Sequence, residues 1–178
     1  PGTITSEKVL DAKKNNYIAS LIQVKDSFGY SVIDTSTGEF YVGECQSDDL
    51  YETLSKYNPS EILLPKSISY NIQDWFIKLR PYVTSIEDLH FNYDSAYRNL
   101  VGHFKVNSLK GFGCEHLSNG IIAAGGLYLY LKNNLSKNVN HLKRISPIND
   151  TGFMGLDGYT IRNLEVFDSI SSHNVNGT

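Results

Sequence analysis

Residues 154–167, MGLDGYTIRNLEVF, carry charged and polar side chains at regular intervals, as an active site can. Asp157 stands three residues before Thr160, whose backbone N–H it can accept as a helix N-cap. Arg162 and Glu165 are then neighbours on one helical face, where such a pair contributes roughly 0.2–0.5 kcal/mol. The apolar positions recur at helical spacing and are Ile161, Leu164 and Phe167. The spacing therefore predicts a capped amphipathic helix rather than a catalytic site.

The cysteines and histidines match no metal-binding or nucleophilic pattern. Cys45 and Cys114 are too few for a disulfide framework and too far apart for a metal knuckle, which favours a reducing cytoplasm. Cys114, although close to His116, lies in an apolar turn and is interpreted as a small packing residue. The five histidines lack metal-pair spacing, and no phosphate-binding glycine–lysine motif occurs. We therefore expect neither a metal site, nor ATP binding, nor a catalytic residue in this chain.

The length of 178 residues suits one domain and the beginning of another, since domains most often have roughly 100–150 residues. The net charge of −3 is unevenly distributed, because residues 98–144 hold seven basic side chains and one acidic one. This basic segment can face nucleic acid or an acidic partner, or be a solvated helix face. No apolar run reaches the roughly 20 residues of a membrane helix. The start, PGTITSEKVL, indicates a piece of a longer protein.

The first part of the chain predicts a three-stranded antiparallel meander. Turns are expected at residues 26–29 and 36–38, where glycine and polar residues gather. A helix follows, with Ser47 or Asp48 as its N-cap, and it ends before Asn58-Pro59. The strand runs, rich in β-branched and aromatic residues, are YIASLIQV, YSVIDTS and GEFYVGE.

Strand and helix patterns alternate further along the chain. EILLP, residues 61–65, is continuously apolar, which is typical of a parallel strand covered on both faces. A helix stopped by Pro81 and a strand between residues 82 and 93 are expected next. Asp94 is then expected to cap another helix. The apolar stripes of these two helices are Ile72, Trp75, Phe76 and Leu79, and then Tyr97, Leu100, Val101 and Phe104.

A longer helix over residues 116–134 is apolar nearly all round and should be buried. Its Ala-Ala-Gly-Gly run, residues 123–126, would let a neighbouring backbone approach closely. Residues 142–178 predict short extended pieces and then one helix, and the polar tail has no anchor.

Three antiparallel strands followed by alternating helices and strands are the chain order of a ribonuclease-H-like α/β domain, and other α/β meanders share that order. Enzymes with that fold hold two divalent ions with carboxylates, beginning on the first strand. Here the first strand has no acid, and EILLP offers only Glu61, at its entry. Asp34 and Glu39 lie beside a turn, where such side chains bond nearby backbone groups. We favour turn chemistry, with a divergent metal-dependent nuclease as the alternative.

Five stretches, in this order, resemble the bacterial DNA mismatch-repair family MutS. They are PGTITSEKVL, GYSVIDTSTGEFYVGE, NPSEILLP, LKGFGCEHLSNGIIAAGGLYLYL and MGLDGYTIRNLEVF. The resemblance implies that residues 1–140 are the connector domain, domain II of the family, with its ribonuclease-H-like fold. It also implies that residues 141–178 begin the mostly α-helical core or lever domain, domain III.

The resemblance implies a non-catalytic role for this piece. The family's mismatch-reading domain, with a Phe-x-Glu motif that is missing here, should precede the chain, and its ATPase should follow it. The connector would transmit signals between the mismatch-binding, core and ATPase domains and offer a surface to MutL. The parent protein would be a cytoplasmic, homodimeric ATPase that uses ATP and magnesium and binds mismatched duplex DNA. A relative that lacks the mismatch reader and acts in recombination is a further alternative.

Two sets of residues are candidates for contacts. The basic ones, expected to contact DNA or a partner, are Lys132, Lys137, Lys143 and Arg144. Those expected to fix how the core meets the connector are Asp157, Arg162, Asn163 and Glu165.

Overall fold

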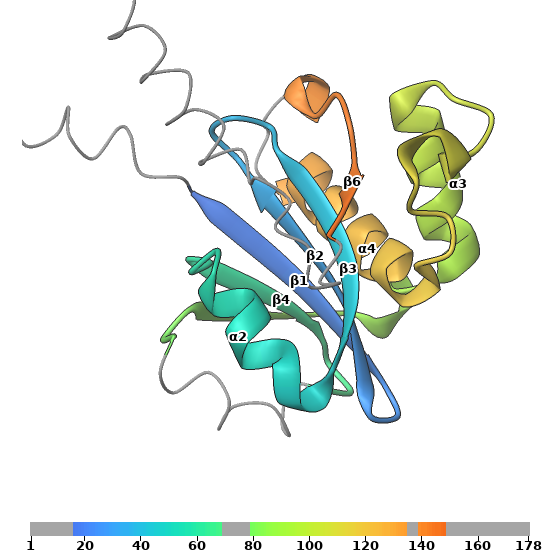
Figure 1. The fold of residues 1–178 in the computed structure, drawn as a ribbon. Helices are drawn as coiled ribbons and strands as arrows, with labels where there is room; N and C mark the ends of the chain where they lie inside the picture. The colour runs from blue at the N-terminus through green and yellow to red at the C-terminus, as the bar shows by residue number, and fades with distance from the viewer. Residues whose placement is uncertain (1–15, 69–78, 135–138, 149–178) are drawn as a thin grey trace, which may run out of the picture. The chain divides into compact units, whose positions relative to one another are not determined.

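The strand-forming runs assemble into one six-stranded sheet with the order β5-β4-β1-β2-β3-β6 (Figure 1). The computed structural model describes residues 16–68, 79–134 and 139–148. The chain divides into two compact units, Pro1–Ile148 and Asn149–Thr178, and the described residues all belong to the first. The strands are β1 (Tyr17–Val24), β2 (Ser27–Asp34), β3 (Phe40–Gln46), β4 (Glu61–Pro65), β5 (Tyr82–Ile86) and β6 (Ser146–Pro147).

Strand directions follow the sequence prediction. β1, β2 and β3 form the antiparallel meander, and EILLP is β4, which runs parallel to both β1 and β5. β6 runs parallel to β3, so that β2 is the only strand of this described sheet that opposes the others. The mixed α/β fold with a ribonuclease-H-like strand order is therefore confirmed.

The first turn is tighter than expected. Only Lys25 and Asp26 connect β1 to β2, and Lys25 adopts the left-handed conformation with φ 57°. Gly29, expected in this turn, lies inside β2 instead. A Cβ there would lie 2.2 Å from the backbone carbonyl carbon of Asn119, at the start of a helix that crosses the sheet. Gly29 therefore allows the helix to approach the strand closely, and it does not form the turn.

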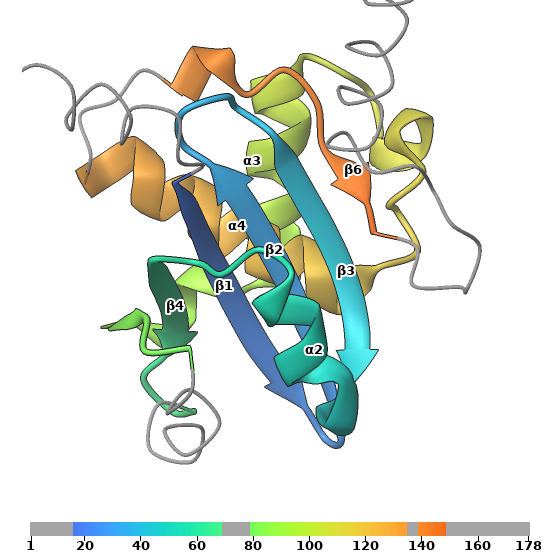
Figure 2. The ribbon, with the colours of Figure 1, turned by 60° about the vertical axis from the view of Figure 1, so that its left-hand side comes forward.

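Helices cover both faces of the sheet (Figure 2). They are α2 (Leu50–Ser55), α3 (Tyr93–Phe104) and α4 (Ser118–Asn134), with short 3-10 turns η1 (Ser47–Asp49), η3 (Asp88–His90), η4 (Leu109–Phe112) and η5 (Val139–His141). One core lies between α2 and the sheet, and a larger core lies between the sheet and α3 with α4. Neighbouring residues of β2 show this division, since Val32 belongs to the first core and Ile33 to the second.

α4 is buried along most of its length, as predicted, and it packs closely against α3. A Cβ on Gly125 would lie 2.2 Å from the Cβ of Ala96 on α3. The predicted close approach at residues 123–126 is therefore confirmed. The α3 stripe is also confirmed, because Leu100 is fully buried and Tyr97, Val101 and Phe104 pack against the same core.

Two predicted helix caps are wrong. Ser47 donates its hydroxyl to the backbone oxygen of Asp26 at 2.8 Å, and so holds the β1–β2 turn instead of capping α2. α3 begins one residue before Asp94, and its cap is Asn92, whose side chain accepts the N–H of Ser95 at 3.1 Å. At α3 a polar residue two positions before Asp94 reaches the free backbone N–H first. At α2 the N-cap position is held by Asp49, and no side chain, neither that of Ser47 nor that of Asp48, makes a capping hydrogen bond.

Within residues 142–148, which the sequence predicts to be extended, Ser146 and Pro147 form β6 beside β3, and the other residues have no regular secondary structure. The division of domains at residue 140 stays a prediction. The helix expected around Ile72, Trp75 and Phe76, and the one expected beyond residue 154, lie outside the described residues. Within the described part of the chain, no helix combines the length and apolar character needed to cross a membrane.

Candidate functional site

Asp34, at the end of β2, is a structural carboxylate. It is fully buried and accepts hydrogen bonds from the backbone and hydroxyl of Ser36 at 2.8 and 2.6 Å, and from the hydroxyl of Thr37 at 2.9 Å. Burial alone raises the pKa of Asp34, but the hydrogen bonds from Ser36, Thr37 and the backbone of Asn16 together outweigh it and lower the pKa below the usual value. The predicted turn chemistry is confirmed.

The other two acids considered for a nuclease site, Glu39 and Glu61, accept hydrogen bonds from hydroxyl groups of the protein. Glu61 accepts hydrogen bonds from the hydroxyls of Thr84 at 2.6 Å and Tyr130 at 2.7 Å, and so links β4 to β5 and α4. Glu39 accepts a long hydrogen bond from the Tyr17 hydroxyl at 3.4 Å. In residues 16–68, 79–134 and 139–148, no three His, Cys, Asp or Glu side chains are grouped to hold a metal ion.

Cys114 is a packing residue, as predicted. Its side chain is fully buried in the larger core, and its sulfur lies 3.9 Å from the backbone oxygen of Leu109. Burial raises the pKa of the thiol. A buried thiol with a raised pKa forms little thiolate, which is the reactive species.

Asn16, the residue before β1, lies beside the loop that connects β2 to β3. We call residues Thr35–Glu39 the β2–β3 loop. The backbone N–H of Asn16 is donated to the Asp34 carboxylate at 3.3 Å, and its backbone oxygen accepts the N–H of Thr35 at 3.1 Å. Its side-chain oxygen accepts the hydroxyl of Ser60 at 2.9 Å. Asn16 is thus held to both the β2–β3 loop and the approach to β4.

The chain leaves the described fold along residues 139–148, the exit segment, which passes the same loop. Gly38 has φ +83°, and a Cβ there would lie 2.6 Å from the backbone oxygen of His141. Leu142 and Ile145 are buried in the larger core. The N–H of Ile148 is donated to the backbone oxygen of Val42 at 2.8 Å. The β2–β3 loop therefore contacts both the residue before β1 and the exit segment.

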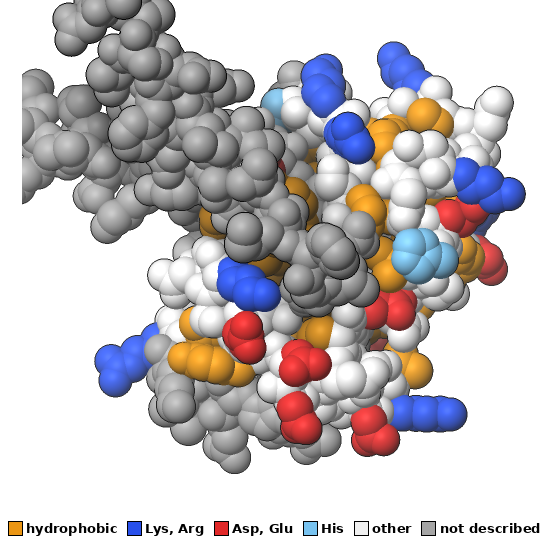
Figure 3. Space-filling model, in the orientation of Figure 1, with side chains coloured by type: hydrophobic (Ala, Val, Ile, Leu, Met, Phe, Trp, Pro, Cys, Tyr) orange, Lys and Arg blue, Asp and Glu red, His pale blue; other side chains and the backbone are white. Residues whose placement is uncertain are grey.

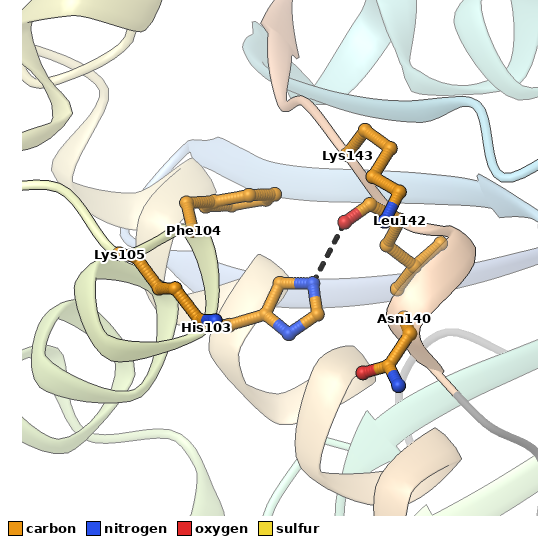
Figure 4. Close-up of a pocket in the computed structure, with 6 residues that line it drawn as sticks. All are labelled: His103, Phe104, Lys105, Asn140, Leu142 and Lys143. Atoms are coloured by element: carbon orange, nitrogen blue, oxygen red, sulfur yellow. Dashed lines mark hydrogen bonds between the residues drawn. The ribbon is translucent and has the colours of Figure 1, made fainter.

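A hollow of about 400 Å³ lies between the end of α3 and the exit segment (Figure 4). A nitrogen of the His103 ring lies 2.8 Å from the backbone oxygen of Leu142, and this contact links α3 to the exit segment (Figure 4). The lining residues are His103, Phe104, Lys105, Asn140, Leu142 and Lys143. A neighbouring hollow of about 300 Å³ lies against the β2–β3 loop and shares Lys143 with the first.

The structure brings three of the four predicted basic residues to this end of the fold. Lys143 and Arg144 are exposed on the exit segment, and both line the second hollow. The Lys132 ammonium lies 5.9 Å from the centre of the Tyr128 ring, which in turn lies 4.9 Å from the His103 ring. Lys137 lies outside the described residues, as do Asp157, Arg162, Asn163 and Glu165.

Sequence reasoning missed Lys105. This residue follows the last residue of α3, has φ 55°, and lines the first hollow opposite the exit segment. A basic residue directly after a helix is a common C-terminal feature, but its place beside Lys143 depends on a contact between segments almost 40 residues apart. We call Lys105, Lys132, Lys143 and Arg144 the basic surface.

The sheet, the β2–β3 loop with its contacts to Asn16 and to the exit segment, and the basic surface define an α/β domain. Comparison with known proteins gives its family. The family model described as MutS domain II matches residues 16–143. The chain belongs to the MutS family, and this match places its domain II on the described fold.

Proteins called DNA mismatch repair protein MutS resemble the chain along nearly all of its length. Those of Flavobacterium johnsoniae and Cytophaga hutchinsonii are 36% identical over 175 residues and 38% identical over 169 residues, which cover 98% and 95% of this chain. That of Dehalococcoides mccartyi is 33% identical over 178 residues, or 100% of the chain. In each case the chain spans 20% of the relative's length.

Proposed function

We propose that this chain is the non-catalytic connector of a DNA mismatch-repair protein, and that it transmits signals between a mismatch-reading domain and the core and ATPase domains. Its membership of the MutS family supports the repair role. One structural observation supports transmission: the β2–β3 loop contacts both Asn16, the residue before β1, and His141 on the exit segment.

The physical basis is the rigidity of this contact. Asp34 holds the loop from inside with hydrogen bonds to Ser36 and Thr37, while its remaining bond holds Asn16. Gly38 fits against His141 because it has no Cβ. A displacement of Asn16 therefore acts on the β2–β3 loop. The loop cannot move without losing hydrogen bonds around the buried Asp34 carboxylate. The displacement passes to the exit segment.

The rest of the assignment follows the family. The parent protein is proposed to be a cytoplasmic, homodimeric ATPase that uses ATP and magnesium, binds mismatched duplex DNA and recruits MutL through the connector. Asp157, Arg162, Asn163 and Glu165 are proposed to fix the contact between connector and core. The basic residues Lys132, Lys137, Lys143 and Arg144 are proposed to contact DNA or a partner.

Replacing Gly38 with alanine in the full-length parent tests the transmission. The change adds a Cβ at a left-handed position, 2.6 Å from the His141 backbone oxygen, and so separates the loop from the exit segment. Gly102→Ala is the matched control, because nothing lies within 4 Å of the Cβ it adds. We expect the Gly38 variant to bind mismatched DNA and ATP separately, but to lose the effect of a mismatch on ATP turnover and on MutL recruitment.

The control should behave as the wild-type protein in all four assays. If the Gly38 variant keeps the full effect of a mismatch on ATP turnover while its stability is visibly lowered, the loop does not carry the signal. If it recruits MutL normally but loses the ATPase response, the MutL surface is independent of the loop.

A further inference from the structure

The basic surface gathers cations from three separate elements. Lys105 follows α3, Lys132 is on α4, and Lys143 and Arg144 are on the exit segment. Figure 3 shows Lys and Arg side chains gathered at one end of the described fold, over the end of α3 and the exit segment. We propose that the basic surface binds the phosphodiester backbone of duplex DNA. This inference rests on the proposed function, which places the chain in a protein that works on DNA.

The two hollows share Lys143, and we call them together the track. Lys105 and Lys143 line the first hollow from opposite sides, so that the end of α3 and the exit segment face each other across it. Lys143 also lines the second hollow, together with Arg144. Lys132 is connected to the same end through the rings of Tyr128 and His103. A polyanion following the track would therefore meet basic groups in succession.

Among the described residues, the charge around the track is almost purely positive. None of the described side chains that line the first hollow is acidic, and Glu39 is the single acid among those that line the second. The ion pairs recorded among the described residues, Lys66–Glu87 and Lys110–Glu115, lie elsewhere and include none of the four cations. Exposed cations without a carboxylate partner hold diffuse counterions, and phosphate contacts release counterions into solution.

The helix end beside the track opposes anion binding in part. The carbonyl groups at the end of α3 carry partial negative charge, which disfavours an anion there. Lys105 lies at that end and adds a full positive charge, and its backbone N–H satisfies the oxygen of Val101. The cation therefore exceeds the partial charge of the helix end, and we expect an attraction that is weak and independent of base sequence.

The lining favours a nucleic-acid backbone over an acidic protein segment. Protein interfaces draw most of their affinity from large side chains buried in pockets of the partner. In the first hollow, the rings of Phe104 and His103 are already packed, against Phe112 and Tyr128 respectively. The ammonium groups of Lys105 and Lys143 also line this hollow, and such donors suit phosphate oxygens and require no apolar anchor.

Fluorescence anisotropy with a short labelled duplex, measured on the 178-residue chain over a range of salt concentrations, tests the proposal. About three phosphate contacts give a slope of log K against log salt of roughly −3. Lys143→Gln with Arg144→Gln should make this slope less negative by about 2, since one contact is lost at each position. Lys105→Gln with Lys132→Gln should act in the same direction.

Lys25→Gln with Arg98→Gln is the matched control, because it also removes one lysine and one arginine, both exposed and both outside the track. The control should keep the wild-type slope. Circular dichroism checks that all variants keep the fold. The proposal is overturned if the wild-type chain does not bind the duplex at low salt, or if the control pair changes the slope as much as the Lys143 and Arg144 pair.

Competition with poly-glutamate distinguishes a site for the DNA backbone from a site for an acidic protein. Displacement of the duplex only at a large excess of poly-glutamate supports a phosphodiester site, whereas tighter binding of poly-glutamate overturns it in favour of an acidic protein partner. The result is independent of the test of transmission. The Gly38 variant keeps the four cations, and the Lys143 and Arg144 variant keeps the loop.

Discussion

Asp34 and Asn16 are joined by a hydrogen bond of 3.3 Å between the Asp34 carboxylate and the Asn16 backbone N–H. The bond connects the buried end of β2 to a residue that precedes β1, and Asn16 also exchanges hydrogen bonds with Thr35. The ribonuclease-H-like fold made Asp34 a candidate for metal binding. Its carboxylate instead accepts the hydrogen bonds that hold Asn16 and the β2–β3 loop together. Its acceptor capacity is used by donors from the protein itself.

Replacing Asp34 with asparagine should destabilise the fold. Asparagine has the same shape, but its amide NH2 group replaces one of the two carboxylate oxygens, and so faces either the Ser36 donors or the Thr37 hydroxyl. The expected loss in the free energy of unfolding is about 1–3 kcal/mol. Urea denaturation measures it. Asp26→Asn, at an exposed turn position, is the control and should change stability by less than about 0.5 kcal/mol.

The contribution of Asp34 should also depend on pH in a defined direction. Its pKa in the folded protein is lowered, so the ionised form is preferred in the folded state. The stabilisation is therefore complete above the unfolded pKa of about 3.9 and is lost as pH falls through the lower folded value. The difference in stability between wild type and Asp34→Asn should be constant near neutral pH and shrink in acid. A difference that stays constant into strong acid would contradict this account.

The carboxylate of Glu44 should anchor the start of α4. This side chain, on β3, accepts the backbone N–H of Asn119 at 2.7 Å, and a longer bond of 3.4 Å joins it to the N–H of Gly120. These are free donors at the positive end of the helix. Glu44→Ala should cost about 0.5–2 kcal/mol. Gln46→Ala, two residues along the same exposed strand face, should have a much smaller effect in the same denaturation assay.

Two glycines of the helical layer should respond to alanine with opposite signs. Gly125 lies where an added Cβ would meet the Cβ of Ala96 at 2.2 Å, so Gly125→Ala should force α3 and α4 apart and cost about 1–3 kcal/mol. Gly102, on α3, has nothing within 4 Å of an added Cβ. Gly102→Ala should stabilise the protein by about 0.4–1 kcal/mol, because alanine loses less chain entropy on folding. Thermal and urea unfolding of both variants test the signs.

The sequence predicts those features that local pattern determines. Residue alternation and apolar runs identify β1 to β4, and the helical stripe and small residues identify α3 and α4. The role of Gly29 and the capping by Glu44 are not predictable in this way, since each depends on α4 lying across the sheet about 75 to 90 residues later in the chain. The same holds for the basic surface. Lys143 and Arg144 are evident as charges in the sequence, but Lys105 joins them only because α3 ends beside the exit segment.

The hydrogen bond between Tyr130 and Glu61 should couple α4 to the parallel half of the sheet. The Tyr130 hydroxyl donates to the Glu61 carboxylate at 2.7 Å, and burial together with that carboxylate raises the pKa of the phenol. Thr84 on β5 donates to the same oxygen at 2.6 Å, so one carboxylate holds α4, β4 and β5. A hydrogen bond to a charged acceptor contributes about 1.5–3 kcal/mol when buried, and less at this half-buried position.

A double-mutant cycle with Tyr130→Phe and Glu61→Gln isolates the coupling free energy of the hydrogen bond between Tyr130 and Glu61. We expect the two single changes to be less than additive by about 1 kcal/mol, because either one removes most of the charge-assisted bond. Thr84→Val in place of Tyr130→Phe provides the parallel cycle for β5. Strict additivity in the first cycle would mean that the Tyr130 hydroxyl and the Glu61 charge are not coupled, so that this hydrogen bond would not be what holds α4 to this half of the sheet.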